Sequence, residues 1–165
     1  MTTRSTDDRQ APPVALQTAT VADLDRLLDL IRAYHDFEGI AHSRGRMSDA
    51  IRPLLGNSEL GRIWLITLDD QIIGYTALCF GYSIEFAGRD AFVDELFVVS
   101  EQRGRGIGRQ VLELIKIEAR QLDVKALHLE VARDNHQAQR LYRAVGFTAR
   151  DKYLLMTESI SDDAV

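Results

Sequence analysis

The sequence predicts a single α/β domain in which one mixed β-sheet carries helices on both faces. Runs rich in apolar and β-branched residues alternate with segments whose apolar residues recur at three- and four-residue steps, as in amphipathic helices. The run at 91–99 is apolar at adjacent positions in its second half, which is typical of a strand buried on both faces. The predicted order is strand, two helices, three strands, helix, strand, helix and two strands, which amounts to six to seven strands and about four helices.

The first part of the chain predicts a short strand followed by two helices. Residues 14–16 form the strand, and Thr20 can cap a helix that starts at Val21 and ends at Gly39. Apolar residues on one face of that helix are expected to pack against the sheet. We expect a second, short helix at 47–55.

The rest of the chain predicts the sheet and its second layer. Two strand-like runs, 63–68 and 72–80, flank Asp69-Asp70-Gln71, whose turn chemistry is typical of a hairpin. After the strand at 91–99 and a glycine-rich loop, we expect a helix at 106–122, a strand at 126–131, a helix at 135–145 and closing strands at 147–148 and 153–156.

The composition fits one ordinary domain and excludes several classes of protein. The chain has 165 residues, 45% hydrophobic and 27% charged, with 20 basic residues against 25 acidic ones. The net charge of −5 argues against a nucleic-acid partner. No apolar run approaches the roughly 20 residues of a membrane span, so no membrane partner is expected. We expect the domain at 13–158, with frayed tails at 1–12 and 159–165.

Cysteine and histidine usage points to a protein without disulfides or metal. Cys79 is the only cysteine, so an internal disulfide is impossible and a reducing cytoplasm is the simplest location. We expect Cys79 to be a buried strand residue. The four histidines show no metal-ligand spacing.

The segment Arg103-Gly104-Arg105-Gly106-Ile107-Gly108 lies between the buried strand and a helix. Backbone N–H groups at a helix N-terminus have no helical partner and carry partial positive charge, and glycine lets a phosphate approach the backbone. Three arginines add fork-shaped donors that match phosphate geometry: Arg103, Arg105 and Arg109. The segment 103–109 therefore predicts a pyrophosphate-binding loop.

Two common nucleotide-binding motifs fit the loop less well. The chain lacks the P-loop pattern G-x-x-x-x-G-K-[ST]. A dinucleotide fingerprint that starts at Gly104 and Gly106 needs a glycine at position 109, where Arg109 stands, although Glu130 lies near the offset of a ribose-binding acid. A surface turn without a ligand is the remaining alternative, and three glycines with three arginines argue against it.

Motifs around the loop carry a family resemblance. Arg103, Gly106 and Gly108 match Q/R-x-x-G-x-G/A, and the stretch 138–147 matches A-x-x-L-Y-x-x-x-G-F. With the strand before the loop and the stretch 127–135 in the expected places, the chain resembles the GNAT superfamily of N-acetyltransferases over about residues 14–156. Asp94-Glu95 makes it similar to the diamine and thialysine acetyltransferase branch, where the usual order of the pair is Glu, then Asp.

The resemblance implies a GNAT-like fold and an acetyl-CoA-dependent N-acetyltransferase. The acetyl group would pass directly to a primary amine of a small molecule, polyamine-like or amino-acid-like, in an enzyme that is commonly a homodimer. The strands beside the loop would splay apart, so that the pantetheine arm pairs with Leu96, Phe97 and Val98, while residues 103–109 hold the pyrophosphate and Asn135 contacts the far side of the cofactor. A coenzyme A-binding module without turnover and a protein N-terminal or lysine acetyltransferase stay open as alternatives.

The transfer needs a group that removes a proton from the amine, whose pKa is near 10.4, and a group that protonates the leaving thiolate. Asp94 and Glu95 suit the first task. As neighbours in a strand they point to opposite faces unless a bulge intervenes, so physics alone does not choose between them, whereas the resemblance favours Asp94. The resemblance makes Tyr142 the general acid, although its place on an apolar helix face also fits a core residue.

Candidates for the acceptor site come from the first helix and the connection at 81–90. Tyr34 and Glu38 are one turn apart, and in this family that helix borders the acceptor site. Glu85 and Asp36 are further acidic candidates, and ordinary surface charge is the alternative for all of them.

Overall fold

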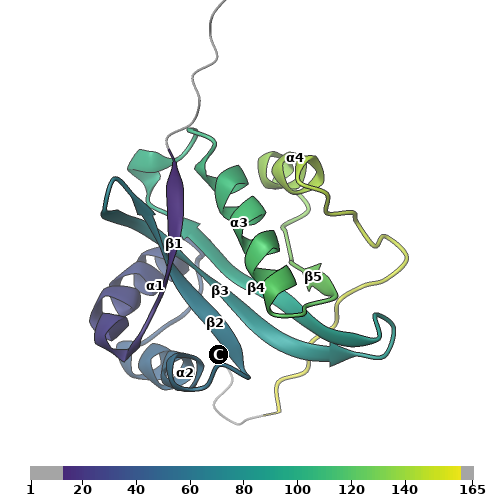
Figure 1. Cartoon of the computed structure of the whole chain (residues 1–165), viewed down its shortest axis with the longest axis horizontal. Helices are drawn as coiled ribbons and strands as arrows, with labels where there is room; N and C mark the ends of the chain where they lie inside the picture. Colours follow the sequence, from purple (N-terminus) through teal and green to yellow (C-terminus); the bar gives the residue numbers. More distant parts are fainter. Residues whose placement is uncertain (1–12, 161–165) are drawn as a thin grey trace, which may run out of the picture.

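A five-stranded sheet with helices on both faces forms the centre of the structure (Figure 1). The structure, a computed structural model, describes residues 13–160. The strands lie side by side in chain order, the first three pairs antiparallel and the last pair parallel. They are β1 (Val14–Thr18), β2 (Gly61–Leu68), β3 (Gln71–Ser83), β4 (Gly88–Val98) and β5 (Ala126–His128).

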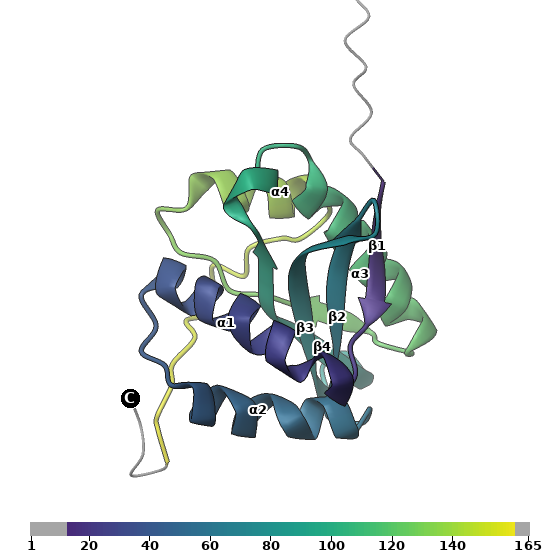
Figure 2. The ribbon, with the colours of Figure 1, turned by 90° about the vertical axis from the view of Figure 1, so that its left-hand side faces the viewer.

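The helices form one layer on each face of the sheet (Figure 2). Helices α1 (Leu24–Glu38) and α2 (Arg44–Gly56) cover one face, where they bury a core with Leu65, Tyr75 and Phe97. Helix α3 (Ile107–Gln121) covers the other face, with α4 (His136–Ala144) beside it. Two single turns, η1 (Val21–Asp23) and η2 (Ser100–Gln102), precede α1 and the glycine-rich loop. The mixed sheet with helices on both faces is thereby confirmed.

The first helical segment begins and ends where capping chemistry predicts. The Thr20 hydroxyl accepts from the Ala22 amide, and the Thr20 amide donates to Asp23 at 2.9 Å, which completes a capping box. Gly39 ends α1 in the left-handed conformation, with a φ of 71°. The last turn of α1, from Tyr34 to Glu38, therefore ends at a defined point of the chain.

The predicted closing strands at 147–148 and 153–156 are wrong. Within residues 13–160 the sheet has five strands instead of six to seven, and the chain after α4 forms none. Tyr153, Leu154, Leu155 and Met156 are between 57% and 87% exposed. An apolar run becomes a strand only where a free strand edge pairs with it, and that non-local partner is not visible in the run itself.

β5 is also shorter than expected, because it ends at His128 rather than at 131. Of the predicted tails, residues 1–12 and 161–165 lie outside the described residues. Residues 159 and 160 are exposed and belong to no helix or strand. In the described part of the chain, no helix is long and apolar enough to span a bilayer.

Candidate active site

β4 and β5 separate after a short parallel ladder. Asp90, Ala91 and Phe92 pair with β5, and β4 then runs on to Val98 with no β5 residue opposite it. On that side, the backbone of residues 93–98 therefore has no β5 ladder. This geometry matches the splayed strands that the family resemblance implies, and the predicted backbone partners Leu96, Phe97 and Val98 all lie in the unpaired stretch.

The loop that follows β4 presents an open helix N-terminus. Gly104 and Gly106 have φ values of 76° and 77°, a conformation that favours glycine. Gly106 is the N-cap of α3 and supplies no side-chain cap, so the first amides of α3 have no helical partner. Those amides, with the positive end of the helix dipole, form a site for an anion.

The three arginines of the loop do different things. Arg103 turns toward α1: its Nε donates to the Val98 carbonyl at 2.8 Å, and its guanidinium lies 4.3 Å from the centre of the Phe37 ring. Arg103 therefore braces the end of β4 against α1, and only its Nη donors are left for the predicted phosphate contact. Arg105 donates to Gln102, and Arg109 is exposed on the first turn of α3.

Two further predicted cofactor residues serve the packing of α4. A Cβ on Gly108 would meet the Leu141 side chain at 3.2 Å, so this glycine lets α4 pack closely on the start of α3. The Asn135 side chain accepts from the Ala138 amide at 3.0 Å and caps α4. Both residues fix how α4, and with it Tyr142, sits beside the loop.

A β-bulge brings Asp94 and Glu95 to the same face of the sheet. Ala77 of β3 pairs with Glu95 and Leu78 pairs with Val93, which leaves Asp94 as an extra residue. Glu95 contacts Tyr75, and Asp94 accepts from the Cys79 thiol. Residues 75 and 79 share one face of β3, so the bulge, which the sequence left open as the exception, brings both carboxylates to one face.

The two carboxylates have different surroundings. Glu95 Oε2 accepts from the Tyr75 hydroxyl at 2.5 Å, and Glu95 Oε1 lies 2.8 Å from His35 Nε2. Asp94 keeps only a weak donor, the Cys79 thiol, among its named partners. Burial, and next the negative charge of Glu95, raise the pKa of Asp94 above its ordinary value.

Tyr34 on α1 lies near the carboxylate pair, and Tyr142 on α4 lies near Tyr34 and Glu38. Burial and then the charges of Glu38 and Glu95 raise the pKa of Tyr34 to about 12, and Tyr142 and Asp94 act on it more weakly. Burial and then Glu38 also raise the pKa of Tyr142. These mutual effects require short separations, so the fold brings together five of the residues singled out in the sequence.

Glu85 does not belong to this cluster. It lies at the tip of the β3–β4 hairpin and forms an exposed ion pair with Arg150 at 2.8 Å. Ser83, at the end of the ladder, lies six residue steps along β3 from Ala77, a span of roughly 20 Å. Asp36, the other acidic candidate, contacts His42 at 2.8 Å.

Sequence reasoning missed His35 and Tyr75, which hold Glu95. Both looked like ordinary members of an amphipathic helix and a buried strand. The bulge did leave a signal: the apolar residues of β4 that pack on the α3 face are spaced by two at Ala91 and Val93, and then by three to Leu96. A break in the period of two is what an inserted strand residue produces.

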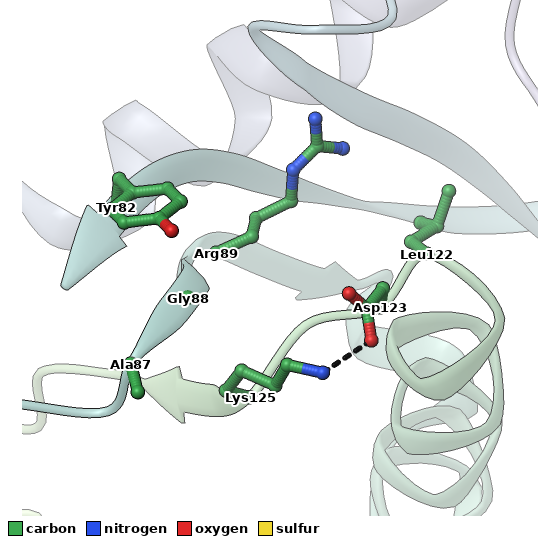
Figure 3. A pocket seen from close by; sticks show the side chains of 7 residues that line it. All are labelled: Tyr82, Ala87, Gly88, Arg89, Leu122, Asp123 and Lys125. Atoms are coloured by element: carbon green, nitrogen blue, oxygen red, sulfur yellow. Dashed lines mark hydrogen bonds and ion pairs between the residues drawn. The ribbon is translucent and has the colours of Figure 1, made fainter. Parts of the chain in front are cut away.

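A shallow hollow of about 420 Å³ lies elsewhere, where the β3–β4 hairpin meets the end of α3 (Figure 3). Arg89 and Lys125 are its basic residues, and each has an acidic partner, Glu59 and Asp123 respectively. None of the predicted site residues lines it. The chemistry is therefore concentrated around the open end of β4.

The fold and this site define an acyltransferase with an anion-binding helix end, an open strand and a carboxylate pair. The model of the acetyltransferase (GNAT) family matches residues 24–147. The chain is 31% identical over 127 residues to an uncharacterized N-acetyltransferase of Archaeoglobus fulgidus, covering 73% of this chain and 86% of that protein. It is 32% identical over 75 residues to thialysine N-epsilon-acetyltransferase of Bos taurus, covering 46% of this chain and 44% of that protein.

Solved structures agree in fold. An integron cassette protein from the mobile metagenome of Cole Harbour Salt Marsh has a TM-score of 0.78 and 31% identity, covering 88% of this chain and 90% of that one. A predicted acetyltransferase of Clostridium acetobutylicum, solved with acetyl-CoA, has a TM-score of 0.72 and 20% identity over 88% of this chain and 96% of that one. The chain belongs to the GNAT family and is an N-acetyltransferase, with a likeness to the thialysine acetyltransferase branch.

Proposed function

We propose that this protein transfers the acetyl group of acetyl-CoA to a primary amine of a small, cationic molecule. The observation that carries the proposal is the bulge in β4, which sets Asp94 and Glu95 beside an open strand that ends at an uncapped helix. The geometry fits the co-substrate: residues 96–98 lie where β4 has no β5 ladder, which suits a pantetheine arm, and the amides at the start of α3 suit a pyrophosphate. A structural neighbour was solved with acetyl-CoA, which supports the same assignment.

Asp94 is the proton acceptor in this proposal. At neutral pH an alkylamine with a pKa near 10.4 carries a proton on all but roughly one molecule in a thousand. Asp94, whose pKa is raised by burial and by Glu95, takes that proton directly or through water. The neutral nitrogen then attacks the thioester carbon in a ternary complex.

Tyr142 is the proton donor to the leaving sulfur. Burial and Glu38 raise its pKa, so the phenol stays protonated until negative charge develops on the sulfur. Transfer from a phenol with an ordinary pKa near 10 to a thiolate with one near 8.5 is uphill by roughly 2 kcal/mol. The donation is therefore expected to accompany the breaking of the C–S bond rather than to precede it.

The acceptor site lies against the last turn of α1. Tyr34 and Glu38 approach the carboxylate pair from that helix, and an acidic, aromatic wall suits an alkylammonium group. The thialysine acetyltransferase named among the relatives acts, by its name, on a side-chain amine, which supports a substrate of amino-acid or polyamine type. Glu85, which pairs with Arg150, is not part of the proposed acceptor site.

A panel of amines tests the proposal. Release of free thiol from acetyl-CoA is measured with diamines, lysine analogues, aminoglycosides and N-terminal peptides, and the acetylated product is verified by mass. Asp94→Asn should lower kcat/KM for the best small amine by roughly 10²- to 10⁴-fold. Asp49→Asn, which removes an exposed carboxylate on α2, is the matched control and should keep activity. Preference for peptides over every small amine would contradict the acceptor assignment.

We also propose that the enzyme is a homodimer of the cytoplasm. The run at 153–156 keeps four large apolar side chains exposed, which a second copy of the chain would cover. The β5 side of the sheet ends in a strand of three residues, which leaves room for an added strand. The single free cysteine, Cys79, suits a reducing compartment.

A further inference from the structure

Glu95 is held from two elements at once. Its Oε2 accepts from the Tyr75 hydroxyl of β3 at 2.5 Å, and its Oε1 lies 2.8 Å from Nε2 of His35 on α1. The His35 and Glu95 side chains are only 15% and 19% exposed. This carboxylate is therefore fixed in orientation, whereas Asp94 next to it contacts the weak donor of Cys79.

The His35 ring contacts Glu95 through one of its two nitrogens, Nε2. An ionised carboxylate can only accept hydrogen bonds, so the hydrogen must be on Nε2. Nδ1 is buried and has no hydrogen-bond partner among the described residues. A second proton there would be a buried donor without an acceptor, which is costly. The Nε2–H of His35 therefore donates to Glu95, and this contact fixes the orientation of the carboxylate.

We propose that His35 and Tyr75 are positioning residues that keep Glu95 as the fixed anion of the pair, so that Asp94 is the carboxylate that exchanges protons with the acceptor amine. The proposal rests on the acetyl transfer proposed above. Asp94 first accepts the proton of the ammonium group and passes it to solvent. As the N–C bond forms and the C–S bond breaks, a second amine proton moves to Asp94 and the Tyr142 proton moves to the sulfur. Asp94 and Tyr142 then exchange protons with solvent, and Glu95 neither gains nor loses one.

The groups that face the pair come from three elements or connections. They are Tyr75 and Cys79 on β3, Tyr34 and His35 on α1, and Glu130 after β5, while Glu38 on α1 and Tyr142 on α4 lie near Tyr34. Within this ring, Tyr75 and His35 are the donors to Glu95. Without one of them, Glu95 takes up a proton more readily and shares it with Asp94, because two adjacent carboxylates resist double ionisation.

Paired substitutions separate a positioning role from a structural one. His35→Gln places an amide N–H near the position of Nε2, whereas the shorter His35→Asn reaches only the position of Nδ1. The acidic limb of the kcat/KM profile should move to higher pH by about half a unit or more in His35→Asn and Tyr75→Phe, and return toward the wild-type position in His35→Gln. Glu95→Gln should move it to lower pH, because the like charge beside Asp94 is gone.

The titration of Asp94 itself gives a readout without turnover. The ¹³C signal of its carboxyl group, followed by NMR across the same pH range, should titrate at lower pH in His35→Asn and Tyr75→Phe, as in Glu95→Gln, because a proton on Glu95 removes the like charge beside Asp94. An unmoved Asp94 titration in both His35→Asn and Tyr75→Phe would overturn the proposal, whatever their stability. Tyr75→Phe removes only one oxygen, so it keeps the test valid if His35→Asn fails to fold. Titrations that shift as expected in a protein that acetylates no amine would refute the proposed function and leave the network standing.

Discussion

Asp94 and Glu95 are neighbours in the chain, yet their surroundings suit them to different tasks. Glu95 contacts His35 with one oxygen and accepts from Tyr75 with the other, so it is held in one orientation. Asp94 is the extra residue of the bulge, and burial and Glu95 raise its pKa. A carboxylate with raised proton affinity is a better base at neutral pH than an ordinary one.

The raised pKa of Asp94 also has a consequence for stability. In the unfolded chain its pKa is near 3.9, and in the folded protein it is higher, so the folded state binds the proton more tightly. The stabilisation is fully present below the unfolded pKa and is lost as the pH rises through the folded pKa. Asp94→Asn removes the ionised, desolvated group, so its free energy of unfolding should exceed that of the wild type at pH 8.

That gain should shrink as the pH falls through the folded pKa of Asp94 and vanish near pH 3.5. Urea unfolding of both proteins at pH 8, 6, 5 and 4 measures it. Asp49→Asn, whose carboxylate is exposed on α2, should show little difference from the wild type at any of these values. A destabilised Asp94→Asn protein at pH 8 would mean that the Asp94 charge is satisfied rather than desolvated.

Tyr142 offers a second test at the residue scale. Its ring packs against Phe147, with ring centres 6.1 Å apart, so loss of the hydroxyl in Tyr142→Phe should leave the packing intact. We expect kcat to fall roughly 10- to 100-fold, at the lower end of general acid catalysis, while the KM for acetyl-CoA changes less than twofold. Steady-state kinetics with the best amine measures both. Wild-type turnover would mark Tyr142 as a core residue only.

At the scale of elements, the junction of β4 and α3 combines an open strand with an open helix end. Gly106→Ala forces a methyl group into the left-handed conformation at a cost of roughly 1 kcal/mol and crowds the amides that face the phosphate. The KM for acetyl-CoA should rise about tenfold or more, with a smaller change in kcat. Gly45→Ala, in α2, where a Cβ would meet nothing within 4 Å, should leave both unchanged.

Much of this scale could be predicted from the sequence, because its causes are local. The Thr20 cap, the Gly39 and Gly146 stops and the Asp69-Asp70 turn depend on a few adjacent residues; both turn residues have positive φ, as the hairpin requires. The closing strands failed because strand pairing depends on a distant edge. In the site, the residues singled out from the motifs and from the first helix lie close together: Tyr34, Glu38, Asp94, Glu95 and Tyr142.

The remaining features of the site depend on side chains meeting across elements. His35 reaches Glu95 from α1 over 60 residues of chain, and Tyr75 reaches it only because the bulge turns Glu95 to its face. Arg103 carries the family motif, but its side chain braces Phe37 rather than extending along the loop. No short sequence pattern contains these contacts.

At the scale of the molecule, each face of the sheet carries a different part of the proposed site. Helices α3 and α4 on one face carry the glycine-rich loop and Tyr142, and α1 and α2 cover the carboxylates on the other. β4 connects the two layers, because side chains at its open end pack against helices on both faces of the sheet. In the proposed reaction, co-substrate and acceptor therefore meet at the end of one strand, each supported by its own layer.

The exposed run at 153–156 makes a prediction about assembly. The wild-type protein should sediment as a dimer at micromolar concentration, and Leu154→Asp with Leu155→Asp should shift it to monomer, because charges replace apolar side chains at the contact. Analytical ultracentrifugation measures the mass. Ile84→Asp, on the 95% exposed hairpin tip, is the control and should stay dimeric. A wild-type monomer would contradict the proposal.

A crystal structure of the protein with coenzyme A is the sharpest test of the proposed site. We expect the pyrophosphate on the first amides of α3, the pantetheine arm along residues 96–98, and the sulfur within hydrogen-bonding reach of the Tyr142 hydroxyl, on the side where Asp94 faces the open end of β4. Coenzyme A in the hollow between Arg89 and Lys125, or a sulfur far from both Asp94 and Tyr142, would contradict the proposal.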